Sequence, residues 1–120
     1  MKSALLTMTW LAVLSLATLA QMETIEIETP QKAKRIAGVV TDPTGYPLSE
    51  VTVEERSDDW RTVLRSTETD EHGKFHFSTS RNKKVYHLEF VRSGFKWVRI
   101  TVELEKKGAR SIVVSLPVGT

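Results

Sequence analysis

Apolar and polar side chains alternate with a period of two along most of the chain that follows residue 33. This period is typical of β-strands with one buried and one solvated face, because successive side chains of a strand point to opposite sides. No segment after residue 20 carries the 3.6-residue period of a helix. We expect strands over residues 34–41, 50–56, 61–69, 74–78, 85–91, 96–104 and 110–116.

The apolar positions of these strands define the expected core. They are Ile36, Gly38, Val40, Val51, Val53, Phe75, Phe77, Tyr86, Leu88, Phe90, Val98, Ile100, Val102, Leu104, Ile112, Val114 and Leu116. One-sided strands joined by tight turns bury their apolar faces by stacking two antiparallel sheets. The sequence therefore predicts an all-β fold, a seven-stranded antiparallel β-sandwich. Gly38 in this inward series indicates a close approach of the opposite sheet, or a β-bulge.

Aspartate and glycine define the expected turns, at Asp42, Gly45, Asp70, Gly73 and Gly94. Glycine permits a positive φ, and each of the two aspartates precedes a turn glycine by three residues. At such a position a carboxylate accepts hydrogen bonds from backbone N–H groups of its own turn. The alternative is calcium binding, which needs about six to eight oxygen ligands and which neither short turn supplies by itself.

The first twenty residues differ from the rest of the chain. Lys2 is their only charge, and it is followed by a long apolar run and then by small residues ending at Ala20. This order predicts a secretory signal peptide that is cleaved after Ala20, so that the protein is secreted or periplasmic. The alternative is an uncleaved membrane anchor, since roughly 17–25 apolar residues span a bilayer. Residues 21–33 are polar and contain Pro30, and we expect a tether there. The alternative is a short edge strand, because Ile25 and Ile27 alternate with glutamate.

Charge predicts a mixed, solvated exterior. The chain has 17 basic and 15 acidic residues, so removal of Lys2 with the leader leaves 16 bases against 15 acids. Such a balance attracts neither nucleic acid nor anionic lipid, and we expect membrane contact only through an uncleaved leader. The densest basic run, Arg81, Lys83 and Lys84, is interpreted as a charged turn. The chain has no cysteine, so the apolar core must hold the domain together without disulfides.

Two stretches carry the features of a known domain family. They are Ile36-x-Gly38-x-Val40-x-Asp42-x-x-Gly45-x-Pro47-Leu48-x-x-Val51-x-Val53 and Thr67-x-Thr69-Asp70-x-x-Gly73-x-Phe75-x-Phe77. Together with Tyr86-x-Leu88 and the Gly94-Phe95 pair, they resemble the carboxypeptidase regulatory-like domains over residues 34–118. The resemblance implies a prealbumin-like (transthyretin-like) Greek-key sandwich. It also implies an accessory or binding module, not a catalyst.

The histidines are the natural candidates for chemistry. His72 and His76 fall on a turn and a strand, so their rings diverge. His76, His87 and Glu89 would share an exposed sheet face if their two strands form a hairpin, which makes a surface metal site an alternative to solvated histidines.

No peptidase, nucleophile, P-loop or dinucleotide motif occurs in the sequence. The chain also ends without the Tyr-Arg-Gly-Ser tail of the hydroxyisourate hydrolases, which share the prealbumin fold. We therefore expect no catalytic residues, no cofactor and no metal.

Three aromatic residues lie outside the expected core. Trp97 falls on the polar positions of its strand, Trp60 lies in a loop, and Tyr46 is at the tip of a turn. Exposed aromatic rings stack on sugars or anchor protein partners, so these are the candidate ligand-binding residues. Alternatively, Trp97 packs over a sheet edge or against the tether.

Three hypotheses on function follow. The first is an interaction module that binds an unknown protein or carbohydrate in the cell envelope or outside the cell. The second is a structural stand-alone sandwich without a ligand, and the third is a metal-binding or weakly hydrolytic protein. The sequence does not identify a partner.

Overall fold

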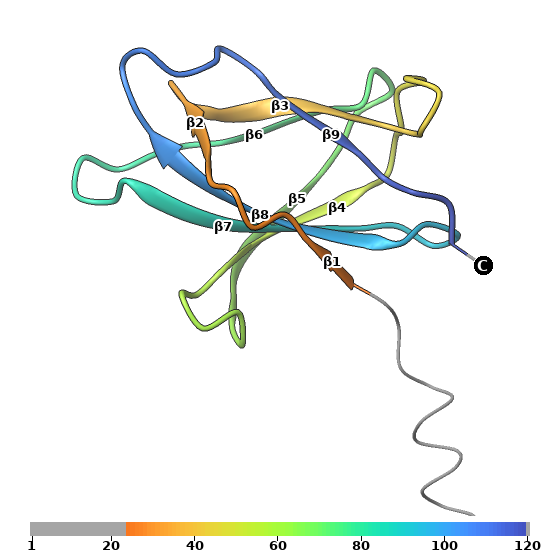
Figure 1. The fold of residues 1–120 in the computed structure, drawn as a ribbon, viewed down its shortest axis with the longest axis horizontal. Coiled ribbons are helices and arrows are strands. Elements are labelled where there is room, and N and C mark those ends of the chain that lie inside the picture. The colour runs from red at the N-terminus through yellow and green to blue at the C-terminus, as the bar shows by residue number, and fades with distance from the viewer. Residues whose placement is uncertain (1–23, 120) are drawn as a thin grey trace, which may run out of the picture.

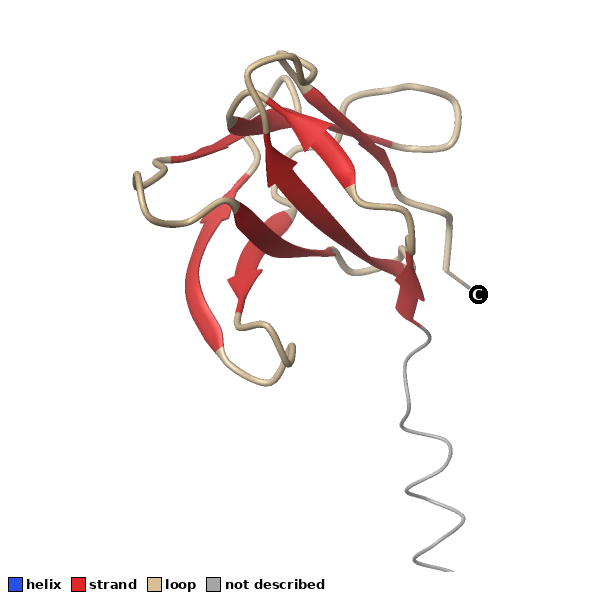
Figure 2. Cartoon of the chain, turned by 60° about the vertical axis from the view of Figure 1, so that its left-hand side comes forward, coloured by secondary structure: helices blue, strands red, loops and turns tan. Residues whose placement is uncertain are grey.

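A computed structural model describes residues 24–119 of the chain. These residues form nine strands and no helix (Figure 1, Figure 2). The strands are β1 (Thr24–Glu26), β2 (Gln31–Ala33), β3 (Ile36–Thr41), β4 (Thr52–Arg56), β5 (Val63–Glu68), β6 (Lys74–Phe77), β7 (Val85–Val91), β8 (Trp97–Leu104) and β9 (Ile112–Ser115). Strands β3 to β9 lie within the seven segments expected from the alternation of apolar residues.

The strands form two sheets. The larger sheet has the order β1–β8–β7–β4–β5, with β2 also paired to β8, and the smaller sheet has the order β6–β3–β9. Figure 1 shows the smaller sheet stacked over the larger one. The predicted all-β sandwich is confirmed.

The prediction of seven antiparallel strands is wrong in number and in direction. Nine strands are present among the described residues, and β1 and β2 pair with β8, and β3 with β9, in parallel. Both additional strands come from residues 21–33, where we expected a tether. Ile25 and Ala33 turn towards the core, and Pro30, which has no N–H to donate, lies between the two strands.

The core lies between the sheets and consists of the predicted inward positions. Fully buried aliphatic side chains of the larger sheet include Val53, Leu88 and Ile100. Phe75 of the smaller sheet meets Phe90 of the larger sheet edge to face, with the ring centroids 5.3 Å apart. This ring geometry is the favourable one for aromatic pairs and connects the two layers.

Gly38 lies where two neighbouring strands of the smaller sheet come closest. A Cβ on Gly38 would overlap the backbone carbonyl of Ile112, its partner in the parallel pairing of β3 with β9. The expectation of a close approach is therefore correct, but the approaching backbone belongs to the adjacent strand and not to the opposite sheet.

The two aspartate turns form as predicted. Asp42 Oδ1 accepts backbone N–H groups of Thr44 at 2.8 Å and Tyr46 at 3.0 Å. Asp70 Oδ1 accepts those of His72 and Lys74, both at 2.9 Å. The turn glycines with positive φ are Gly45, Gly73 and Gly94. Each carboxylate thus stabilises its own turn.

The predicted signal peptide, residues 1–20, lies outside the described residues, and so does its cleavage point after Ala20. Within residues 24–119, no helix is long and apolar enough to cross a membrane. Secretion, periplasmic location and anchoring by the leader stay predictions.

Candidate binding face

The outer face of the larger sheet, which is turned away from the core, holds a buried acid between two arginines. Glu89 of β7 is only 2% exposed, although it lies on the solvent-facing positions of its strand. Its carboxylate accepts a hydrogen bond from Nε of Arg99 in β8 at 2.8 Å. Its other oxygen lies 2.9 Å from Nε of Arg56 in β4, a contact that is electrostatic because that Nε is not aligned for a hydrogen bond. The cluster joins three adjacent strands.

The loop between β4 and β5 folds over this cluster and carries Trp60. The Trp60 ring meets the His87 ring edge to face at 4.9 Å, and the guanidinium of Arg99 lies 4.9 Å from the Trp60 centroid. Trp60 has a φ of 66°, which is rare for a bulky residue, and its carbonyl accepts a hydrogen bond from Arg56 at 3.0 Å. The Trp60 ring thus lies against two residues that flank Glu89 on this face, His87 of β7 and Arg99 of β8.

The structure brings two of the three predicted aromatic residues to one face. Trp97 begins β8 on the same side of the sheet as Arg99, and it is half-buried. Tyr46 is 71% exposed in the turn that follows β3, a strand of the smaller sheet. Among residues 24–119, no ring contact joins Tyr46 to either tryptophan.

The alternative of a surface metal site is wrong in its geometry. β6 pairs with β3, whereas β7 pairs with β4 and β8, so His76 and His87 lie in different sheets. Residues 78–84 cross from one sheet to the other and do not close a hairpin. His87 instead lies 3.2 Å from the hydroxyl of Thr101 and 3.3 Å from the carboxylate of Asp58. The described part of the chain contains no cluster of three or more potential metal ligands.

Sequence reasoning missed a second buried acid, Glu55, at one end of the core. Glu55 is 4% exposed and is held by Arg65 Nε and Lys83 Nζ, each at 2.6 Å. Burial raises the pKa of Glu55, but the hydrogen bonds from Lys83 and Arg65 outweigh it and hold the pKa below its usual range. The sequence contained a signal for this burial: Glu55 continues the series Val51, Val53 of alternate residues that face the core.

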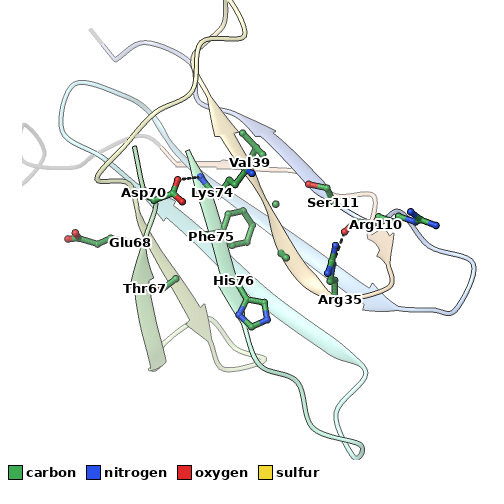
Figure 3. A pocket seen from close by; sticks show the side chains of 12 residues that line it. Arg35, Val39, Thr67, Glu68, Asp70, Lys74, Phe75, His76, Arg110 and Ser111 are labelled. Carbon is green, nitrogen blue, oxygen red and sulfur yellow. Dashed lines mark hydrogen bonds between the residues drawn. The ribbon is translucent and has the colours of Figure 1, made fainter. Parts of the chain in front are cut away.

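A wide depression of ≈ 600 Å³ lies over the smaller sheet (Figure 3). Its rim combines acids such as Asp70 with bases such as Arg35, Lys74 and Arg110. Figure 3 shows Asp70 bonded to the backbone of Lys74, and Arg35 bonded to the backbone carbonyl of Arg110. These bonds stabilise the local backbone, and neither tryptophan lines the depression.

The sandwich fold has relatives among known protein families. Residues 35–117 match the family model of the carboxypeptidase regulatory-like domain. The chain belongs to this family. Comparison with the curated proteins finds no match. Carboxypeptidase regulatory-like domains are β-sandwich modules of a regulatory, non-catalytic type.

In this carboxypeptidase regulatory-like domain, the matched residues comprise strands β3 to β9 and both aspartate turns. Strands β1 and β2 precede the match and extend the larger sheet along β8. The family match does not assign a role to Trp60, Trp97 or Tyr46, so ligand binding by these residues stays a prediction.

Proposed function

We propose that the chain is an exported, non-catalytic interaction module that engages a protein or a carbohydrate of the cell envelope. Export is supported by the order of charged, apolar and small residues in the first twenty positions. The non-catalytic role is supported by the regulatory type of the domain family. The proposed contact surface is the outer face of the larger sheet.

One observation carries this choice of surface: Trp97, Arg99 and Trp60 lie on the same face. Tryptophan and arginine are the residue types that most often dominate the binding energy of protein interfaces. The buried Glu89 cluster ties three strands beneath them. A face held in this way loses little conformational freedom when a partner binds.

The contacts of Trp60 favour a structural role for that residue, and they raise a second candidate function for the protein, a structural sandwich without a ligand. Its ring packs against His87 and Arg99, which lie beside Glu89 on this face. Within the described residues, no aromatic or cation–π contact engages the ring of Trp97. We therefore expect Trp60 to stabilise the loop and Trp97 to meet the partner. If Trp97 also serves only as a cover, the protein is a structural sandwich without a ligand.

Site-specific photo-crosslinking in the producing cells distinguishes these functions. A diazirine amino acid, which reacts with protein and carbohydrate alike, replaces either Glu26 or Val113 and leaves Trp97 in place. Glu26 is exposed in β1 and pairs with Arg99 of β8, so it lies on the proposed face. Val113 is the matched control because it is 66% exposed on β9 of the smaller sheet. A discrete adduct at position 26 that is missing at position 113 supports the interaction module. Equal labelling at both positions, or no adduct at position 26, supports the structural alternative.

A further inference from the structure

Six cationic side chains from three separate segments gather at one end of the sandwich, here called the basic end. They are Lys34, Arg35, Arg81, Lys84, Lys106 and Arg110. Two depressions of ≈ 360 Å³ and ≈ 320 Å³ lie there and share Lys34 in their walls. The segments are the β2–β3 link, the β6–β7 loop and the β8–β9 loop, which Figure 1 places at the end away from the C-terminus.

The cations of the basic end lack the ion pairs that four other cations of the sandwich form. Arg56, Arg65, Lys83 and Arg99 each form ion pairs of 2.6–2.9 Å. Within residues 24–119, none of the six cations of the basic end has a carboxylate at ion-pair distance. The single acid in the walls of these two depressions, Glu105, pairs with Lys32 at 3.6 Å. Positive charge is therefore concentrated at the basic end.

This concentration was not visible in the charge of the chain. The overall charge is +2, and the bases alternate with acids along the sequence. Of the run interpreted as a charged turn, Lys83 turns inwards to Glu55, whereas Arg81 and Lys84 line the depression. A chain of nearly balanced charge can thus carry a local field strong enough to attract an anion.

The donor types at the basic end fit phosphate groups. Thr79 and Ser80 line the same depression as Arg81 and Lys84. A guanidinium binds two phosphate oxygens at once, an ammonium adds a point charge, and hydroxyl groups donate to the remaining oxygens. Because an exposed cation attracts a single anion only weakly in water, the ligand must present several such groups.

We propose that the basic end binds a ligand that carries several phosphate groups. The source is either a soluble polyphosphate or the headgroups of an anionic lipid surface. The site does not involve Trp97 or the outer face of the larger sheet, so it is independent of the function proposed above.

Two probes test this proposal on the protein as cells produce it. Tripolyphosphate is titrated by calorimetry, with citrate at equal ionic strength as the carboxylate control. Vesicles of phosphatidylcholine with phosphatidylglycerol are compared with pure phosphatidylcholine vesicles by co-sedimentation. The double variant Arg81→Gln/Lys84→Gln removes two cations of the basic end. The control variant Arg61→Gln/Arg92→Gln removes two cations that lie outside the basic end, one in the β4–β5 loop and one after β7.

We expect binding to at least one phosphate probe, and which probe binds identifies the source. Arg81→Gln/Lys84→Gln should weaken that binding about 30-fold, because each basic side chain near an anionic surface contributes about a factor of five. Arg61→Gln/Arg92→Gln should bind as the wild type does, and both variants should keep the wild-type unfolding midpoint. Three results would each overturn the proposal: no binding to either probe, equal binding of citrate, or equal losses in the two variants.

Discussion

At the scale of single residues, Glu89 shows how a charge is kept inside an otherwise solvated sheet face. It sits between Arg56 and Arg99, whose side chains are 19% and 30% exposed, while the carboxylate itself is almost fully covered. Burying an ion is costly unless it is paired, and the removal of one partner leaves the other charges uncompensated. The stability of this face therefore depends on Glu89 more than on either arginine.

Replacement of Glu89 by glutamine tests this dependence. We expect Glu89→Gln to lower the free energy of unfolding by about 2 kcal/mol, less than for a fully enclosed pair because water reaches both arginines. Denaturant titration measures the change. The control is Glu105→Gln, whose ion pair with Lys32 at 3.6 Å is exposed and should contribute less than about 0.5 kcal/mol. An unchanged midpoint in Glu89→Gln would show that the cluster does not stabilise the sheet.

At the scale of elements, the two aspartate turns couple the fold to pH. The hydrogen bond from the Thr44 side chain, helped by backbone N–H groups, lowers the pKa of Asp42. The backbone N–H of Lys74, followed by that of His72, lowers the pKa of Asp70. Both carboxyls thus bind protons more tightly in the unfolded chain. Their contribution is present above the unfolded pKa of about 4 and is lost as pH falls through the lower folded values.

The double variant Asp42→Asn/Asp70→Asn removes this coupling and leaves an oxygen that can still accept the turn hydrogen bonds. We expect its stability to fall less than that of the wild type between pH 5 and pH 3, since Asn does not titrate there. Urea unfolding at a series of pH values gives the slope. The slope should decrease without vanishing, because Glu55 also has a lowered pKa. A slope equal to that of the wild type would contradict the account of the turns.

The elements also show which parts of the fold the sequence reveals. Strands β3 to β9 were predictable because each one buries alternate side chains, so that apolar residues recur at every second position of the sequence. For β1, the alternation of Ile25 and Ile27 with glutamate left a short edge strand open, but so few residues do not decide between a strand and a tether. β2 shows no such period, and β8, the partner of both strands, lies far along the chain. The polar residues 81–84 indicate a turn between two strands, but a polar turn does not indicate whether the chain stays in one sheet or crosses to the other, as it does here.

The candidate site was predictable in part. Trp97 was identified as an outward-facing residue from its position among Arg99, Thr101 and Glu103. The contacts of Trp60 with His87 and Arg99 depend on the positive φ of Trp60 in its loop. No glycine or asparagine in that loop indicates such a backbone conformation in the sequence. The basic end was missed for a different reason, because it gathers charges from three segments that are separated in the sequence.

At the scale of the whole molecule, the sandwich presents two separate surfaces on one pair of stacked sheets. The core and the turns hold the larger sheet, whose outer face carries Trp97, while the loops at one end hold the basic residues. The proposed function therefore assigns partner recognition to the outer face of the larger sheet, and the further inference assigns phosphate binding to the basic end, which is independent of that face.

The most direct measurement compares stability and partner capture in Trp97→Ala. Thermal unfolding and cross-linked pull-down from the producing cells are performed in parallel on the variant and the wild type. We predict an unfolding midpoint within about 4 °C of the wild type, corresponding to less than about 1 kcal/mol, together with loss of the captured partner. A variant that no longer folds would make Trp97 a structural cover. Undiminished capture by a folded variant would contradict the claim that this face binds the partner.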